Sequence, residues 1–406
     1  MNAPARTATV SEGVRRLTEP HVIGIVGIGF GVLAFWLALP PWTLRGVGWP
    51  LAAGFIAIAC GIAAIPRGER KLGWWAVGLG IAGTVGALWL QTKEAESLDS
   101  ILTAGLVAST LRFATPLAFA AIGGIFSERS GVVNIGLEGM MLMGAFFGIW
   151  GAVWSGTWIV GLLMAMLAGG FLALIHAFFS IHLRADQIVS GFAVNFLALG
   201  LTGYLFSSIY PGGIESGVSR VPNVKLGFLE SVPLVGGFLH GVFGSLNLLV
   251  WVMFGVVILG YVVLFKTPIG LRIRSVGEHP KAADTVGISV YGVRYAAVVA
   301  SGVLAALGGA FLSIGFVGSF SENMTSGRGF IALAAVIFGK WRPGWAFAAC
   351  LLFGFGFALA IPLQREADVS ENLISTLPYV LTLVALVGLI GRSIPPAAVG
   401  RPYVKQ

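Results

Sequence analysis

Polar residues interrupt several long apolar runs of this 406-residue sequence, where they are costly unless they face a cavity or a polar partner. Asn134 and Glu138 are four residues apart, so we expect them to share one helix face near the start of a membrane span. Asn195 lies in the middle of another run, and His176 lies towards the end of a third. Glu138 is predicted to act in a solute pathway or its gate, with a structural hydrogen bond as the alternative. His176 is interpreted as a packed, hydrogen-bonded side chain.

The remaining reactive residues do not indicate catalysis or metal binding. Cys60 and Cys350 both lie within apolar runs, without disulfide or metal-ligand spacing, and the five histidines are scattered. The sequence has no G-x-x-x-x-G-K-[ST] phosphate-binding loop, so any ATP would have to be hydrolysed by another polypeptide. We therefore expect no metal, no cofactor and no enzymatic activity in this chain.

A polar segment at 266–290 carries a second group of candidate residues. Pro280 suits a first helical turn, the residues that follow it favour a short helix as far as Val286, and Gly287 is placed to end that helix. The alternatives are a solvated turn between two spans and a short helix that docks on a cytoplasmic partner. The residues in question are Gly277, Glu278, His279, Pro280, Ala283, Asp284 and Gly287.

The elements that position these residues are predicted to be membrane helices. Hydrophobic residues make up 57% of the chain and charged residues only 10%, and the mean hydropathy is +0.91. A soluble domain needs roughly a quarter of its residues charged. The apolar runs are continuous, unlike the alternating strands of a membrane β-barrel, and many approach the roughly 20 residues that a spanning helix needs. We therefore predict an all-α, polytopic membrane helical bundle.

About twelve spans are expected, at 22–40, 48–65, 72–90, 101–126, 134–154, 158–181, 188–206, 248–265, 291–315, 327–339, 344–361 and 374–391. The span at 327–339 is too short alone and is expected to begin near Met324 or to be partly re-entrant. The predicted organisation is a tail at 1–21, additional N-terminal helices at 22–91, a core at 101–391 and a second tail at 392–406.

The basic residues predict an orientation. With the N-terminus in the cytoplasm, 18 of the 25 Lys and Arg residues fall inside and 6 outside, which is the asymmetry that the positive-inside rule expects. The chain is therefore predicted to be a multi-pass protein of the inner (cytoplasmic) membrane, with both termini in the cytoplasm. Loops beside anionic lipid account for the net charge of +8, so no nucleic-acid partner is expected.

Three stretches resemble one family of transport proteins. Residues 277–288, Gly-Glu-His-Pro-Lys-Ala-Ala-Asp-Thr-Val-Gly-Ile, resemble the coupling loop in permease subunits of bacterial ABC importers. Residues 127–141, which begin Ser-Glu-Arg-Ser-Gly-Val-Val-Asn, resemble the nucleoside-type signature within the ribose, branched-chain amino acid and nucleoside permeases, and residues 327–339 are similar to the same subgroup. The resemblance covers about 100–391, whereas the first 90 residues match no motif.

The resemblance implies a division of labour. Such a permease forms the path for nucleosides or related small polar solutes and couples through its loop, here 266–290, to a separate ATPase that uses the ATP. It pairs with a second homologous permease and receives solute from an extracytoplasmic substrate-binding (lipo)protein.

The resemblance also guides the choice of path residues. The echo of Phe126-Ser127-Glu128 in Phe320-Ser321-Glu322 is typical of inverted repeats. Rings would receive a base and amides a sugar. The predicted path residues are Asn134, Glu138, Asn195, Phe119, Phe320 and Asn323.

Two other functions stay open from the residues alone. An ion-coupled secondary transporter would suit twelve spans, with Glu138 as a proton carrier, although no span pairs a carboxylate with a basic residue in an obvious relay. A membrane enzyme such as a lipid-modifying transferase is the least supported, because no His, Asp or Glu triad clusters near one interface.

Overall fold

The computed structural model describes residues 20–38, 48–92, 103–214, 218–233, 235–366 and 393–405. The chain divides into two compact units, Met1–Ala104 and Gly105–Gln406, and each is described by itself. The predicted span at 374–391 and almost all of the tail at 1–21 lie outside the described residues. The assignment of the first unit as an additional membrane bundle stays a prediction.

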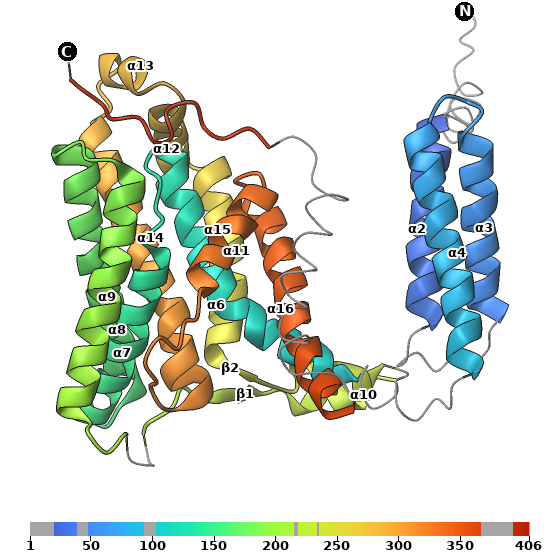
Figure 1. Ribbon diagram of the computed structural model, residues 1–406, viewed down its shortest axis with the longest axis horizontal. Coiled ribbons are helices and arrows are strands. Elements are labelled where there is room, and N and C mark those ends of the chain that lie inside the picture. The colour runs from blue at the N-terminus through green and yellow to red at the C-terminus, as the bar shows by residue number, and fades with distance from the viewer. Residues whose placement is uncertain are drawn as a thin grey trace, which may run out of the picture. The chain divides into compact units, whose positions relative to one another are not determined.

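The described part of the first unit is a bundle of three helices, each of which packs on the other two: α2 (Pro20–Ala38), α3 (Gly48–Ala64) and α4 (Arg70–Thr92) (Figure 1). The helices approach closely through small residues. A Cβ added at Gly61 would lie 2.6 Å from the carbonyl oxygen of Gly73, and one at Gly80 would lie 2.9 Å from that of Gly54. Such small-residue contacts are typical of helices in lipid, which associate through close van der Waals packing because the hydrophobic effect does not drive them together.

The second unit contains the remaining elements. In chain order these are α6 (Ala104–Arg129), α7 (Leu137–Ser155), α8 (Trp158–Ala177), the π-helical η1 (Phe178–His182), α9 (Gln187–Ile209), β1 (Asn223–Lys225), the 3-10 turn η2 (Gly227–Ser231), α10 (Gly236–Phe243), β2 (Ser245–Asn247), α11 (Leu248–Lys266), α12 (Pro268–Glu278), α13 (Pro280–Thr285), α14 (Val290–Ala310), the π-helical η3 (Phe311–Val317), α15 (Arg328–Phe338) and α16 (Pro343–Glu366).

Among the described residues, seven helices are long and apolar enough to cross a membrane. They are α6, α7, α8 with η1, α9, α11, α14 with η3, and α16, and they correspond to seven of the predicted spans. The expected count of about twelve is not confirmed. The three helices of the first unit are not among the seven, and α15 has only 11 residues, so the span expected at 327–339 is too short to cross by itself.

Burial separates the helices into an inner and an outer group. Within their most apolar windows, 72% of α6, 78% of α7 and 72% of α14–η3 are buried, against 28–39% of α8, α9, α11 and α16. The outer group leaves large apolar side chains exposed, such as Leu167, Phe196 and Ile258. A surface of this kind suits lipid rather than water. The structure is therefore that of a multi-pass membrane bundle.

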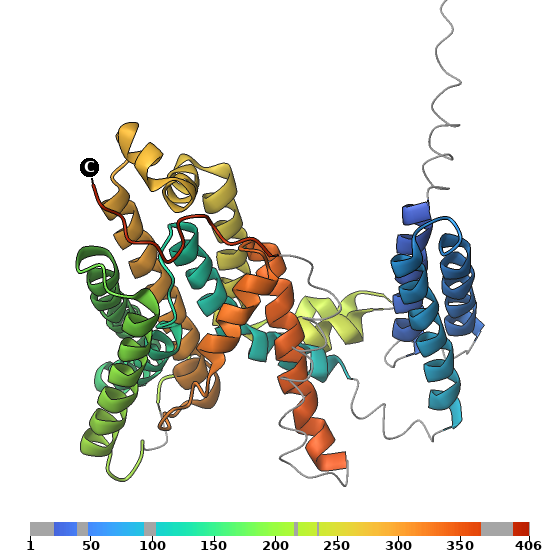
Figure 2. The same cartoon turned by 45° about the horizontal axis from the view of Figure 1, so that its top comes forward.

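The two ends of the second unit differ. Figures 1 and 2 show α12 and α13 at one end, called here the α13 end. The opposite end carries the antiparallel pair β1–β2, in which Asn223 lies opposite Asn247 and Lys225 opposite Ser245; it is called here the hairpin end. These two three-residue strands depart from the predicted all-α fold. They form where a long connection between α9 and α11 folds back on itself, outside the apolar runs.

Candidate coupling and translocation sites

The segment expected to couple to a partner folds as two short helices. The Thr267 hydroxyl caps α12, accepting a hydrogen bond from the Gly270 nitrogen, and Pro268 occupies its first turn. Pro280 occupies the first turn of α13, and Gly287, at φ +82°, lies in the left-handed conformation that glycine adopts without strain. The predicted short helix from Pro280 is confirmed, although it ends one residue earlier than expected.

One side of α13 is anchored in the protein. Ala283 is buried in an apolar cluster with Val276, Val290 and Tyr403. The Asp284 carboxylate accepts a hydrogen bond of 2.8 Å from the Tyr403 hydroxyl. Burial of the Tyr403 ring, followed by its contacts with Asp284, raises the pKa of the Tyr403 phenol above its ordinary value. The hydroxyl therefore remains a donor throughout the neutral pH range.

The other side of α13 is exposed. His279, Lys281, Thr285 and Val286 all face away from the protein, and Val286 is 73% exposed. A bulky apolar side chain at the tip of a rigid projection is a typical anchor for a partner groove. The predicted coupling residues therefore divide: Ala283 and Asp284 hold the helix, whereas His279 belongs to its free face.

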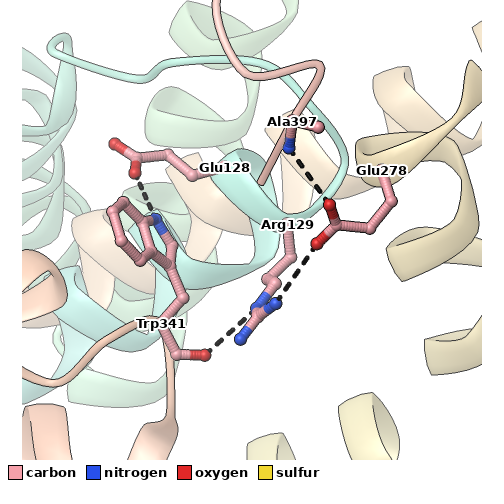
Figure 3. Close-up of polar contacts among 5 residues, drawn as sticks. All are labelled: Glu128, Arg129, Glu278, Trp341 and Ala397. Atoms are coloured by element: carbon pink, nitrogen blue, oxygen red, sulfur yellow. Dashed lines mark hydrogen bonds and ion pairs between the residues drawn. The ribbon is translucent and has the colours of Figure 1, made fainter. Parts of the chain in front are cut away.

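Gly277 and Glu278, at the end of α12, hold this helix against α6. The Glu278 carboxylate accepts a hydrogen bond of 3.1 Å from the Ala397 nitrogen and lies 3.9 Å from the Arg129 guanidinium (Figure 3). Gly277 packs on the chain at Arg129, so that an added Cβ would lie 2.1 Å from the Arg129 carbonyl oxygen. Only glycine allows this close approach of two backbones.

A second junction joins the end of α6 to the turn between α15 and α16. The Trp341 indole donates a hydrogen bond to the buried Glu128 carboxylate, and the Arg129 guanidinium donates to the Trp341 carbonyl oxygen at 3.2 Å (Figure 3). Lys340 and Trp341 have φ values of +52° and +54°, which non-glycine residues adopt only when their surroundings enforce it. Packing and hydrogen bonding of Trp341, which is 4% exposed, provide that enforcement.

Residues 130–136, called here the α6–α7 linker, are buried or half-buried without forming a helix. Figure 1 shows the linker returning from the α13 end into the bundle before α7 begins. Several of its backbone groups bond to side chains. The Gln187 amide oxygen accepts from the Val133 nitrogen at 2.7 Å, and His176 lies 3.0 Å from the Val133 carbonyl oxygen. The prediction that His176 is packed and hydrogen-bonded is confirmed. Irregular backbone at membrane depth needs such partners, because lipid offers none.

The position of Asn134 corrects a prediction. Asn134 lies in the linker and α7 begins only at Leu137, so Asn134 and Glu138 do not share a helix face. Gly131, at φ +94°, and Gly136 flank a run that leaves the helical path, and this break was hidden by the apolar character of the run. The Asn134 amide donates to the Ser301 hydroxyl of α14 at 2.9 Å.

Asn195 holds the start of α7. Its amide oxygen accepts from the Gly139 nitrogen at 2.8 Å, and its amide nitrogen donates to the Ile135 carbonyl oxygen at 3.0 Å. One side chain of α9 thus satisfies an unpaired donor in the first turn of α7 and an acceptor of the linker. Asn134 and Asn195 are therefore engaged in fixing the linker.

Glu138 joins the starts of two helices. Its carboxylate accepts hydrogen bonds of 2.7 Å from the Gly327 nitrogen and 2.6 Å from the Gly329 nitrogen, and the residue is 8% exposed. These nitrogens lie at the N-cap and in the first turn of α15, where the helix dipole favours a negative charge. Glu138 thus connects the start of α7 with the start of α15. Each of these two helices begins after a non-helical stretch.

A hollow of about 290 Å³ opens beside the start of α15. Arg112 and Phe113 of α6, Phe316 of η3, and Asn323 and Arg328 contribute to its wall. Phe316 is 42% exposed. The stretch 316–329 supplies much of this lining. Rings, an amide and charged groups lie together here, as in sites for small polar ligands.

The predicted path residues do not all meet at this hollow. Asn323 lines it, whereas Phe119 and Phe320 are buried in packing contacts. The Phe320 ring centroid lies 5.3 Å from that of Phe146 and 5.1 Å from that of Phe206. Arg112 donates to the Ser245 carbonyl oxygen of β2 at 3.4 Å. Whether any of these residues touches solute stays a prediction.

Sequence reasoning missed several residues of these sites: Gln187, Arg294, Ser301, Trp341 and Tyr403. Gln187 and Arg294 are polar residues at the ends of predicted spans, and the cost of burying them was a usable signal. Arg294 is 1% exposed, and its guanidinium donates to the Ser130 carbonyl oxygen at 3.2 Å. Trp341 and Tyr403 gave no local signal, because their partners are distant in the sequence.

These features define a class of protein. Spanning helices surround an interior in which α7 and α15 begin after non-helical stretches. The short helix α13 projects at one end. No group of His, Cys, Asp or Glu side chains that could hold a metal occurs in the described ranges. The arrangement is that of the membrane-embedded component of a solute transporter.

Comparison with known proteins gives the family. The family model for the permease component of branched-chain amino acid transport systems matches residues 106–386. The chain therefore belongs to this family of ABC transporter permeases. The match begins after the first unit, so α2, α3 and α4 lie outside it.

Curated relatives of the chain are permeases too. The guanosine ABC transporter permease protein NupQ of Bacillus subtilis is 44% identical over 317 residues, which cover 74% of this chain and 96% of that protein. The nucleoside ABC transporter permease protein NupC of Lactococcus lactis is 40% identical, over 74% of this chain and 97% of that protein. The putative glucose ABC transporter permease protein TsgC13 of Haloferax volcanii is 33% identical, over 70% and 91%. No solved structure shows a significant match.

Proposed function

We propose that this chain is the nucleoside-translocating permease subunit of an ABC importer in the bacterial cytoplasmic membrane, with its α13 end in the cytoplasm. The observation that carries the coupling role is α13 itself. This short helix is anchored on one side through Ala283 and Asp284 and exposes Val286 on the other. A helix held in this way is suited to receive force from a partner and pass it to the bundle.

The proposed assembly contains three kinds of partner. A cytoplasmic ATPase would bind the free face of α13, around His279, Lys281 and Val286. A second homologous permease would complete the translocation path. A substrate-binding protein would deliver solute at the hairpin end, because Arg112 in the wall of the hollow bonds to Ser245 of β2 at that end. The permease family supports these partners because its members work in ABC transport systems.

The nucleoside substrate is supported by the relatives NupQ and NupC and by the chemistry of the hollow. The exposed Phe316 ring offers a stacking face for a base, and the Asn323 amide offers partners for sugar hydroxyls. The relative TsgC13 makes glucose the second candidate, since sugars also stack on rings and bond to amides. Nothing in the described part of the chain supports the ion-coupled alternative.

Reconstituted transport tests the proposal. The complex of this chain with its ATPase and second permease is placed in liposomes with the binding protein on the receiving side, and uptake of labelled guanosine and glucose is followed with and without ATP. We expect guanosine uptake that requires ATP. Other nucleosides, but not glucose, should inhibit this uptake by competition. Uptake of glucose alone, or uptake driven by a proton gradient without ATP, would contradict the proposal.

Labelling tests the orientation. Single cysteines at Lys225→Cys, in the hairpin, and His279→Cys, in the coupling segment, are introduced after replacement of Cys60 and Cys350. An impermeant thiol reagent added to intact cells is expected to label position 225 and not position 279. Labelling of position 279 would show that the orientation is the reverse of the one proposed and that α13 does not bind the ATPase.

A further inference from the structure

The segment 393–405, called here the brace, crosses the α13 end and holds both coupling helices. The Ala398 nitrogen donates to the Gly277 carbonyl oxygen at 2.9 Å, and the Ala397 nitrogen donates to the Glu278 carboxylate at 3.1 Å. Farther along, the Tyr403 hydroxyl donates to Asp284 at 2.8 Å. The brace therefore contacts the end of α12 and the last turn of α13.

The same segment also holds the α6–α7 linker. The Gly400 nitrogen donates to the Gly131 carbonyl oxygen at 3.2 Å. The Arg294 guanidinium bonds to the Arg401 carbonyl oxygen at 3.1 Å and to the Ser130 carbonyl oxygen at 3.2 Å. The brace is thus fixed to the coupling helices on both sides of its middle, and the middle itself is fixed to the linker that leads towards Glu138.

We propose that the brace transmits movement of α13 to the α6–α7 linker, and that Tyr403 and Gly400 are its positioning residues. This inference rests on the proposed coupling role of α13. Direct contacts between the coupling helices and the end of α6 are the packing of Gly277 on Arg129, which resists only approach, and the pairing of Glu278 with Arg129 at 3.9 Å. Hydrogen bonds from the brace to both sides add a connection that resists separation as well as approach.

The two positioning residues act at opposite ends of the connection. The Tyr403 ring is 5% exposed and packs with Val276, Ala283 and Val290, while its hydroxyl fixes Asp284. Gly400 has a φ of +75°, which a residue with a Cβ adopts only with strain. The Gly400 conformation aims its nitrogen at Gly131. Loss of either contact weakens the connection between the linker and α13 without touching the exposed face of α13.

The test compares variants of the whole complex in liposomes, with solute transported per ATP hydrolysed as the measurement. Tyr403→Phe keeps the buried ring and removes only the bond to Asp284. In this variant the ratio of solute transported to ATP hydrolysed is expected to fall about three- to tenfold, while ATP hydrolysis and co-purification of the ATPase are unchanged. Gly400→Ala is expected to lower the ratio similarly. Val404→Ala, which alters an exposed neighbour, is the matched control and is expected to behave as the unmodified complex.

A double variant isolates the bond. Asp284→Ala combined with Tyr403→Phe is expected to be no worse than Asp284→Ala alone, because both changes remove the same contact. Unchanged ratios in Tyr403→Phe and Gly400→Ala would overturn the inference. Loss of ATPase binding in Tyr403→Phe would also overturn it, since the brace would then only shape the docking face. Failure of the unmodified complex to transport nucleosides would count against the proposed function instead, because the ratio is measured for whichever solute the complex carries.

Discussion

The backbone nitrogen of Gly329 lies 2.6 Å from the Glu138 carboxylate, and a Cβ added at Gly329 would lie 2.5 Å from the Glu138 Cα. The start of α15 therefore rests on the start of α7 with no side chain between them. Because the colliding atoms belong to backbone, neither side can yield by changing a rotamer. These two helix starts form one mechanical unit in the interior of the bundle.

Gly329→Ala is expected to separate these helix starts and to lower the free energy of unfolding by about 1–3 kcal/mol, since overpacking at a rigid contact costs roughly that amount. The measurement is denaturation of the detergent-solubilised protein. Gly200→Ala in α9 is the matched control, because no atom lies within 4 Å of its added Cβ. Equal loss in both variants would mean that the contact at Gly329 is not tight.

Replacement of Glu138 distinguishes a structural role from a proton-carrying one. Glu138→Ala removes two charge-assisted hydrogen bonds and is expected to destabilise the protein by about 3 kcal/mol. Glu138→Gln keeps a carbonyl acceptor and is expected to lose less stability and to retain part of the ATP-driven uptake. A proton carrier would behave otherwise: Glu138→Gln would then abolish uptake at unchanged stability.

Gly277→Ala is expected to uncouple the permease. The added Cβ would lie 2.1 Å from the Arg129 carbonyl oxygen, so the end of α12 must move away from α6. We expect ATP hydrolysis by the complex to continue while solute uptake falls at least tenfold. Gly255→Ala in α11, where the added Cβ meets nothing within 4 Å, is the control. Full uptake by Gly277→Ala would show that this contact does not carry force.

Variants of the hollow test the solute site. Phe316→Ala is expected to raise the KM for nucleoside uptake about tenfold, in line with the 1–3 kcal/mol that stacking of a base contributes. Asn323→Gly removes the amide and suits the φ of +54° at that position, so its effect reports lost contacts and not strain. Phe196→Ala, on the outer face of α9 and 69% exposed, controls for loss of a ring elsewhere. An unchanged KM in both hollow variants would place the solute elsewhere.

Local signals were sufficient for much of the fold. Hydropathy located the seven spanning helices, and Pro280 with Gly287 located α13, because start and stop signals for a short helix lie within a few residues of it. The α6–α7 linker was misread as the start of a span. Its residues are as apolar as the residues of a spanning helix. They are not helical because they form hydrogen bonds with side chains of α8, α9 and α14.

The candidate sites were predicted less well than the elements. Glu278 and Asp284 were predicted to couple to the ATPase, which stays a prediction, but their bonds to the brace were not foreseen. The partners in these contacts are 119 residues apart in the chain, so no window of sequence contains both. Asn134 and Asn195 were correctly singled out as costly polar groups, but cost alone does not tell whether such a group meets a solute or the backbone of its own chain.

The linker between α6 and α7 has one more consequence, for the way in which the interior opens. In a helix every peptide group is secured by the same repeating pattern, so one bond cannot be given up without weakening its neighbours. Along 130–136 several peptide groups bond instead to side chains of other helices, so that a rotamer change at Gln187 frees the Val133 nitrogen and one at Asn195 frees the Ile135 carbonyl oxygen. We therefore expect amide hydrogen exchange at Val133 to report the release of the Gln187 side chain independently of the neighbouring peptide groups.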